Sequence, residues 1–143
     1  MAYAAQSDLE RLVSPSLLIT LTDDDNNRLV DTAIVSGILD DASGQVDAAL
    51  RAADYTVPVA SPDAYLSGLT ARLCIRPLYA RRASVAQVIP DLLRDMADRA
   101  DQELRDIAAG RLMVGCAVPA SSNGRVAQSD WTPTRWTDNV ELF

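Results

Sequence analysis

Apolar side chains recur every three to four residues along three stretches of the chain, and this spacing marks one face of an α-helix. The clearest stretch, residues 32–54, carries Ile34, Ile38, Ala42, Val46, Ala49 and Ala53. The second begins near residue 61 and carries Leu66, Leu69, Leu73 and Leu78. The third ends near residue 110 and carries Leu92, Leu93, Met96, Ala100, Leu104, Ile107 and Ala108. The pattern therefore predicts three amphipathic helices.

A fourth, shorter helix is predicted near the start of the chain. Ser7 stands three residues before a glutamate, which is the spacing of a capping box, and this predicts a helix over 7–13. The apolar run at 17–21 is too short to be classified and is compatible with a helical turn or a strand. Asp31 or Thr32 is predicted to cap the helix that follows.

Proline and glycine mark the ends of the later helices. Ser61 precedes a proline and is predicted to be the N-cap of the second long helix, which Pro77 should kink or end. The third long helix begins either at Ser84 or close to Pro90. Gly110 is a suitable stop for that helix.

Eight large side chains on these stripes are predicted to be buried in one core: Leu39, Val46, Leu50, Leu69, Leu73, Leu93, Leu104 and Ile107. With 143 residues, the chain is long enough for one domain with such a core. The predicted fold is therefore mostly α, with a small bundle of about four helices that occupies residues 1–111.

Residues 112–143 differ from the rest and are predicted to form an extended C-terminal arm, with room for a short β-strand at 113–118. Four large apolar side chains stand within this arm: Trp131, Trp136, Leu142 and Phe143. A tail selected for solubility alone would not concentrate such groups. We expect them to bind another protein chain, and the alternative that the arm folds back on its own helices remains open.

The charge composition removes most enzymatic chemistry. All 13 basic residues are arginine, histidine is absent, and 20 acidic residues bring the net charge to −7. The chain therefore has no histidine base, no histidine metal ligand and no lysine for a Schiff base or a P-loop. We expect no enzyme activity and no cofactor, and a hydrolase that uses carboxylates alone remains a minor alternative.

Cysteine content and hydropathy bear on the compartment. Cys74 and Cys116 lie in apolar surroundings and are expected to be buried free thiols. No apolar run reaches the length of a membrane span, and the first residues do not resemble a secretory signal. We therefore expect a protein of a reducing interior that makes no contact with a membrane.

One acidic segment is similar to a calcium-binding loop. Oxygen ligands stand at loop positions 1, 3, 5 and 9, which are Asp23, Asp25, Asn27 and Asp31. Two required features are missing, because Arg28 replaces the glycine at position 6 and Ile34 replaces the bidentate acid at position 12. We therefore treat the loop as degenerate and assign no metal to it.

Several short motifs, taken in order, resemble the Mu-type phage family of head-tail connector (adaptor) proteins. They are residues 1–4 (MAYA), 21–23 (LTD), 30–33 (VDTA), 42–43 (AS), 46–47 (VD), 55–58 (YTVP) and 104–111 (LRDIAAGR). The resemblance extends over roughly residues 1–115. No single motif is specific, and the order and spacing of the motifs carry the resemblance.

The resemblance implies a small helical adaptor of the virion neck, assembled in the cytoplasm of the bacterial host. Its expected partners are the portal protein, neighbouring copies in a ring of about twelve, and a tail-proximal neck or stopper protein. DNA would pass through the ring without specific binding, and an acidic surface repels phosphates.

Two other functions fit parts of the sequence. Residues 1–60 carry ten acids and three arginines, which is compatible with an acidic DNA mimic that inhibits a DNA-binding protein. The chain could instead be a tail-completion or stopper ring protein. Stoppers tend to be small β-barrels, and the helical pattern argues against that alternative.

Overall fold

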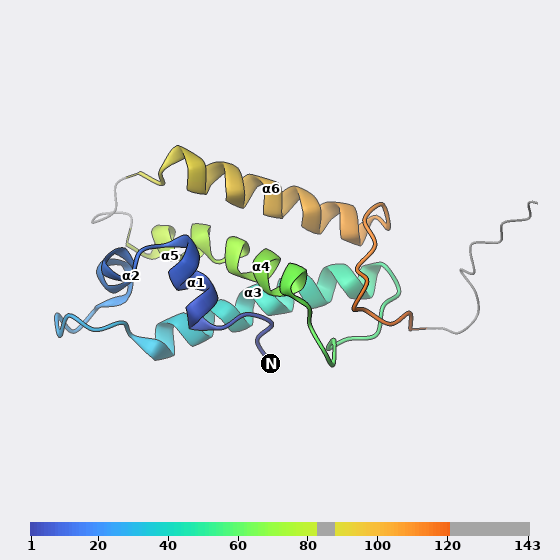
Figure 1. Ribbon diagram of the computed structural model, residues 1–143, viewed down its shortest axis with the longest axis horizontal. Helices are drawn as coiled ribbons and strands as arrows, with labels where there is room; N and C mark the ends of the chain where they lie inside the picture. Colours follow the sequence, from blue (N-terminus) through green and yellow to red (C-terminus); the bar gives the residue numbers. More distant parts are fainter. Residues whose placement is uncertain (83–87, 121–143) are drawn as a thin grey trace, which may run out of the picture.

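The computed structural model describes residues 1–82 and 88–120, and these residues form a helical bundle (Figure 1). Within them lie six helices: α1 (Gln6–Leu12), α2 (Pro15–Thr22), α3 (Thr32–Ala52), α4 (Ala64–Leu73), α5 (Ile75–Arg81) and α6 (Asp91–Ala108). The same residues contain no β-strand, only an isolated antiparallel bridge between Tyr55 and Pro119. The predicted fold class, mostly α, is confirmed.

The two long helices α3 and α6 run in the same direction. α4 and α5 follow one another in the opposite direction (Figure 1). α4 packs against α1, α3 and α6, while α5 contacts α2 and α6. α4 therefore lies at the centre of the bundle, and its leucines Leu66 and Leu69 have no exposed surface.

Two predicted helix starts were wrong. α1 begins at Gln6 with Ala5 as its N-cap, and the Asp8 carboxylate accepts the Ala5 N–H, so Ser7 lies inside the helix. α4 is capped by Asp63, whose Oδ1 accepts the Leu66 N–H at 2.9 Å, rather than by Ser61. A carboxylate at these positions accepts main-chain N–H groups and favours the positive end of the helix dipole.

Three other boundaries agree with the sequence. Asp31 caps α3 through its Oδ1, as one of the two predicted candidates. α6 begins directly after Pro90, the later of its two predicted starts. Gly110 follows its C-cap with φ 71°, a left-handed conformation that glycine adopts without strain.

The predicted helix from residue 61 is divided into α4 and α5 at Cys74. The break comes three residues before Pro77, which lies in the first turn of α5. Proline lacks the N–H that would bond to the Leu73 carbonyl, and its ring would clash with that carbonyl in a continuous helix. The unclassified run at 17–21 is also helical, because Pro15 starts α2 behind the N-cap Ser14.

Six of the eight predicted core side chains are buried: Leu39, Val46, Leu50, Leu69, Leu73 and Ile107. Leu93 and Leu104 are only partly buried, and Leu92 is 68% exposed. The reason is that α6 turns its alanines inward: Ala97 and Ala100 are buried. The large leucines of α6 therefore lie at the edges of its contact with the bundle.

The residues before α1 are tied to the bundle by Tyr3. Its hydroxyl donates to the Asp47 carboxylate and accepts the Val59 N–H at 2.9 Å, while its N–H donates to Ser43 Oγ at 3.0 Å. Burial first, and the bond to Asp47 second, raise the pKa of Tyr3 to about 12. Asp47 of α3 is thus partly buried.

Residues 112–120, the first part of the predicted arm, cross the bundle next to the end of α3. Val114 is 3% exposed and packs in the core. The short strand allowed for at 113–118 does not form: this stretch contains a turn, and the single bridge, at Pro119, comes directly after it. Cys116 is partly buried rather than fully buried.

Candidate functional site

Side chains of the acidic loop between α2 and α3 accept hydrogen bonds from the loop's own main chain. Asp23 Oδ1 accepts the N–H of Asn27 at 3.0 Å, and Asp23 Oδ2 accepts the N–H of Arg28 at 2.9 Å. Asn27 Oδ1 in turn accepts the Leu29 N–H at 2.8 Å. The carboxylate at loop position 1 therefore accepts hydrogen bonds from main-chain amides.

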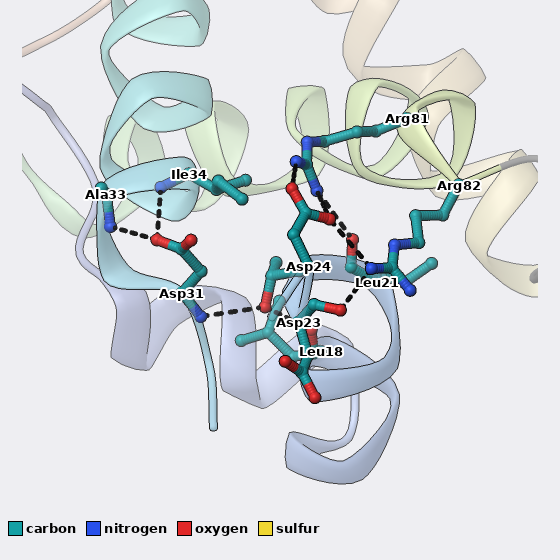
Figure 2. A network of polar contacts seen from close by, with 10 residues as sticks. Leu18, Leu21, Asp23, Asp24, Asp31, Ala33, Ile34, Arg81 and Arg82 are labelled. Atoms are coloured by element: carbon teal, nitrogen blue, oxygen red, sulfur yellow. Dashed lines mark hydrogen bonds and ion pairs between the residues drawn. The ribbon is translucent and has the colours of Figure 1, made fainter. Parts of the chain in front are cut away.

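The second acid of the loop, Asp24, is held by two arginines from the end of α5 (Figure 2). Arg82 Nη2 lies 2.9 Å from Asp24 Oδ1, and Arg81 contacts both carboxylate oxygens. Hydrogen bonds from Arg81 first, and from Arg82, lower the pKa of Asp24 to about 2. Arg81 and Arg82 also donate to the carbonyls of Leu21 and Asp23, so they bind the C-terminal end of α2.

Asp31 closes the loop and begins α3. Its Oδ1 accepts the N–H groups of Ala33 and Ile34 at 3.0 and 3.2 Å. Its own N–H donates to Thr22 Oγ1 at 3.2 Å, which connects the last residue of α2 to the first turn of α3. This network makes the loop a structural connection between three helices.

Loop position 6 has the left-handed backbone conformation that suits the glycine of a calcium loop, but the residue here is Arg28. Arg28 has φ 62°, and Asn26 has φ 55°, both in the left-handed region. Glycine at Arg28 would relieve the strain that a side chain creates there. Asp25, the predicted ligand at loop position 3, is exposed at the surface. Over residues 1–82 and 88–120, no group of three acidic, cysteine or histidine residues is arranged to hold a metal ion.

A second surface feature, which we call the α3–α6 groove, lies between the C-terminal halves of these two helices. It has a volume of about 400 Å³ and is lined by Gln45, Ala48, Ala49, Leu104, Arg105 and Ala108. Most of the lining is apolar. Sequence reasoning missed this feature because it placed Leu104 in the core, and the pattern did not show that α3 lines the same groove with two alanines and a glutamine.

The charged contact between α4 and α6 is also new. Arg72 donates two hydrogen bonds to the Glu103 carboxylate, at 3.0 and 3.1 Å, and the Tyr65 hydroxyl donates a third at 3.0 Å. Burial raises the pKa of Glu103, but the bonds from Arg72 and Tyr65 lower it more. This cluster connects α6 to α4, and its three side chains are hydrogen-bonded to one another. We therefore assign it a structural role.

Other predicted residues fall into two groups. Trp131, Trp136, Leu142 and Phe143 lie outside the described residues. Cys74 is buried, and burial raises the pKa of its thiol to about 12, so it stays protonated and unreactive. None of the six described helices is long and apolar enough to cross a membrane.

Comparison with known proteins supports the resemblance to a Mu-type phage protein. No curated protein and no solved structure matches the chain significantly. The family model described as "Bacteriophage Mu, Gp36" matches residues 3–129, which includes the acidic loop and all six helices. The chain is thus a Mu-type phage protein, and it belongs to the bacteriophage Mu Gp36 family.

Proposed function

We propose that this protein is a head-tail connector, an adaptor that forms a ring between the portal and the tail and lets DNA pass. The observation that carries the proposal is the family match over residues 3–129, which suggests a phage structural or morphogenesis protein. The role in the neck rests on the order of motifs from residue 1 to residue 111. The protein would act in the virion neck after assembly in the host cytoplasm.

The fold supports an adaptor over a stopper. The described residues form six helices without a strand, whereas stoppers tend to be small β-barrels. The chain also lacks histidine and lysine, and the polar clusters described above are hydrogen-bonded within the protein. These features favour a structural role over catalysis.

The acidic DNA mimic is a weaker candidate, because several of its acids are already bound. Asp24 is paired with two arginines, Asp31 caps a helix, and Asp47 accepts the Tyr3 hydroxyl. A surface that imitates the phosphates of DNA needs carboxylates that are free to meet cations of the partner. The acidity of the first 60 residues instead serves the fold and keeps the surface from adhering to passing DNA.

The proposed partners are the portal protein, neighbouring copies of this chain and a tail-proximal neck protein. We propose that Trp131 and Trp136 supply the anchors to the portal or to the next copy, because large aromatic groups dominate the energy of many interfaces. The aromatic segment follows Ala120, the last described residue, which bonds to the carbonyl of Asp54 beyond the end of α3. The last described residue therefore lies beside the C-terminal end of α3, the end that carries the α3–α6 groove.

The test is to measure the mass of the protein with and without the portal of the same phage, by native mass spectrometry. We expect a complex with the stoichiometry of a closed ring on the portal. Leu92→Ala is the control for exposed apolar surface on another part of the bundle and should assemble normally. Absence of any complex between the intact protein and the portal would contradict the proposal.

A further inference from the structure

The α3–α6 groove is an apolar surface that the described part of the chain leaves uncovered. Its floor consists of small side chains, since Ala48, Ala49 and Ala108 face the partly buried Leu104. Gly44, one turn before Ala48, is exposed, and a methyl group added there would meet no atom within 4 Å. The groove has a volume of about 400 Å³ and is shallow and open to solvent.

The rim of the groove is compatible with an aromatic occupant. Arg105 lines one edge, and its exposed guanidinium donates to Gln102 Oε1 at 3.0 Å. A guanidinium next to an apolar floor suits the face of an indole ring, to which it is attracted by the ring quadrupole. The groove therefore offers a tryptophan both an apolar contact and a cation.

The described chain ends close to this groove and heads toward the same end of α3. The Thr56 N–H donates to the Val118 carbonyl, and the Ala120 N–H donates to the Asp54 carbonyl, both at 2.7 Å. Residues 118–120 thus run antiparallel to 54–56, back toward the C-terminus of α3. Asp54 is five residues beyond Ala49, or about 8 Å along a helix axis.

The remaining chain is long enough to reach the groove. Trp131 follows Ala120 by 11 residues, which span up to about 36–40 Å when extended. Because the segment is tethered next to the groove, its effective concentration there is high, and binding within one chain is favoured over binding between chains. Connectivity therefore favours the chain's own segment as the occupant.

We propose that the α3–α6 groove is a binding site for the tryptophan-bearing segment 121–143 of the same chain. One indole, that of Trp131 or Trp136, packs on Ala48 and Leu104 with its face against Arg105. This inference concerns the free chain and does not depend on the role in the neck. It provides a resting state in which the aromatic anchors stay out of water before they meet a partner.

Intrinsic fluorescence tests the proposal, because Trp131 and Trp136 are the two tryptophans of the chain. We expect the emission of the native protein to be blue-shifted relative to the urea-unfolded protein, and to be unchanged on dilution from micromolar to nanomolar concentration. Ala48→Glu should abolish most of the blue shift by placing a charged side chain over the floor. Arg105→Ala should remove part of it.

Ala33→Glu is the matched control, since it makes the same exposed change on α3 about 15 residues away from the groove, and it should keep the blue shift. Circular dichroism should show equal helix content in all variants. Native emission equal to that of the unfolded protein would overturn the proposal, as would an unchanged shift in Ala48→Glu. A blue shift that disappears on dilution would also overturn it, because it would show that a second copy supplies the segment.

Discussion

The surroundings of the two ends of α3 differ in polarity and in how completely the described residues pair or cover them. Before its first residue, the acidic loop pairs its carboxylates with main-chain amides and with Arg81 and Arg82 (Figure 2). Beside its last two turns, the α3–α6 groove leaves an apolar floor that no described residue covers. Among the described residues, the polar end is fully paired and the apolar end is left uncovered. We therefore propose that partner binding belongs to the groove end and to the segment that follows it.

The largest expected effect is on partner binding. Trp131→Ala and Trp136→Ala should each weaken binding to the portal by about 30-fold, because a buried aromatic anchor contributes about 2 kcal/mol or more. Titration of labelled portal with each variant gives the affinities, with Leu92→Ala as the control. Wild-type affinity in both tryptophan variants would show that the groove end is not part of the interface with the portal.

The second prediction separates buried from partly buried leucines. Leu69→Ala should lower the free energy of unfolding by about 2–5 kcal/mol, because Leu69 has no exposed surface and its removal leaves a cavity. Leu104→Ala should cost about 1–2 kcal/mol, because the groove already exposes part of this side chain. Urea denaturation of the two variants gives the difference. Equal losses would mean that Leu104 is covered as fully as the core.

The third prediction concerns the strained residue of the acidic loop. Arg28→Gly should stabilise the protein by about 1 kcal/mol, since a side chain in the left-handed region costs that amount and glycine avoids it. Asn26→Gly should give a smaller gain, because asparagine tolerates this region. Thermal unfolding of both variants measures the gain. A loss of stability in Arg28→Gly would show that the arginine side chain contributes more than its backbone strain costs.

The smallest expected effect is the acid response of Asp24. Its folded pKa of about 2 lies below its ordinary value of 3.8, so its contribution to stability is complete above about pH 4 and is lost as the pH falls toward 2. Asp24→Asn removes that contribution at every pH. The melting temperatures of the two proteins should differ at pH 6 and converge near pH 2. A difference that stays constant with pH would contradict the pairing with Arg81 and Arg82.

Periodicity predicted the helical fold because α3 and α6 are long and strongly patterned. It left α2 unassigned, because its four apolar residues are too few to show a period; this helix packs against α5. It also placed Leu104 in the core, since the stripe defines a face of the helix but not how closely a neighbour covers it. The helices could thus be predicted where the spacing of apolar residues along one segment was sufficient to define them.

The acidic loop shows the same limit for a site. Its resemblance to a calcium loop and its two missing features were visible in the sequence. The pairing of Asp24 with Arg81 was not, because the two residues are 57 positions apart and nothing local connects them. Tyr3 and its buried bonds to α3 were missed for the same reason.

The most direct test of the contrast between the two ends is hydrogen–deuterium exchange of the protein with and without its portal. The account predicts that binding slows exchange in residues 121–143 and leaves residues 23–31 unchanged, because the acidic loop has no part in the contact. Slower exchange confined to residues 23–31 would contradict the account and would place the interface at the polar end of α3.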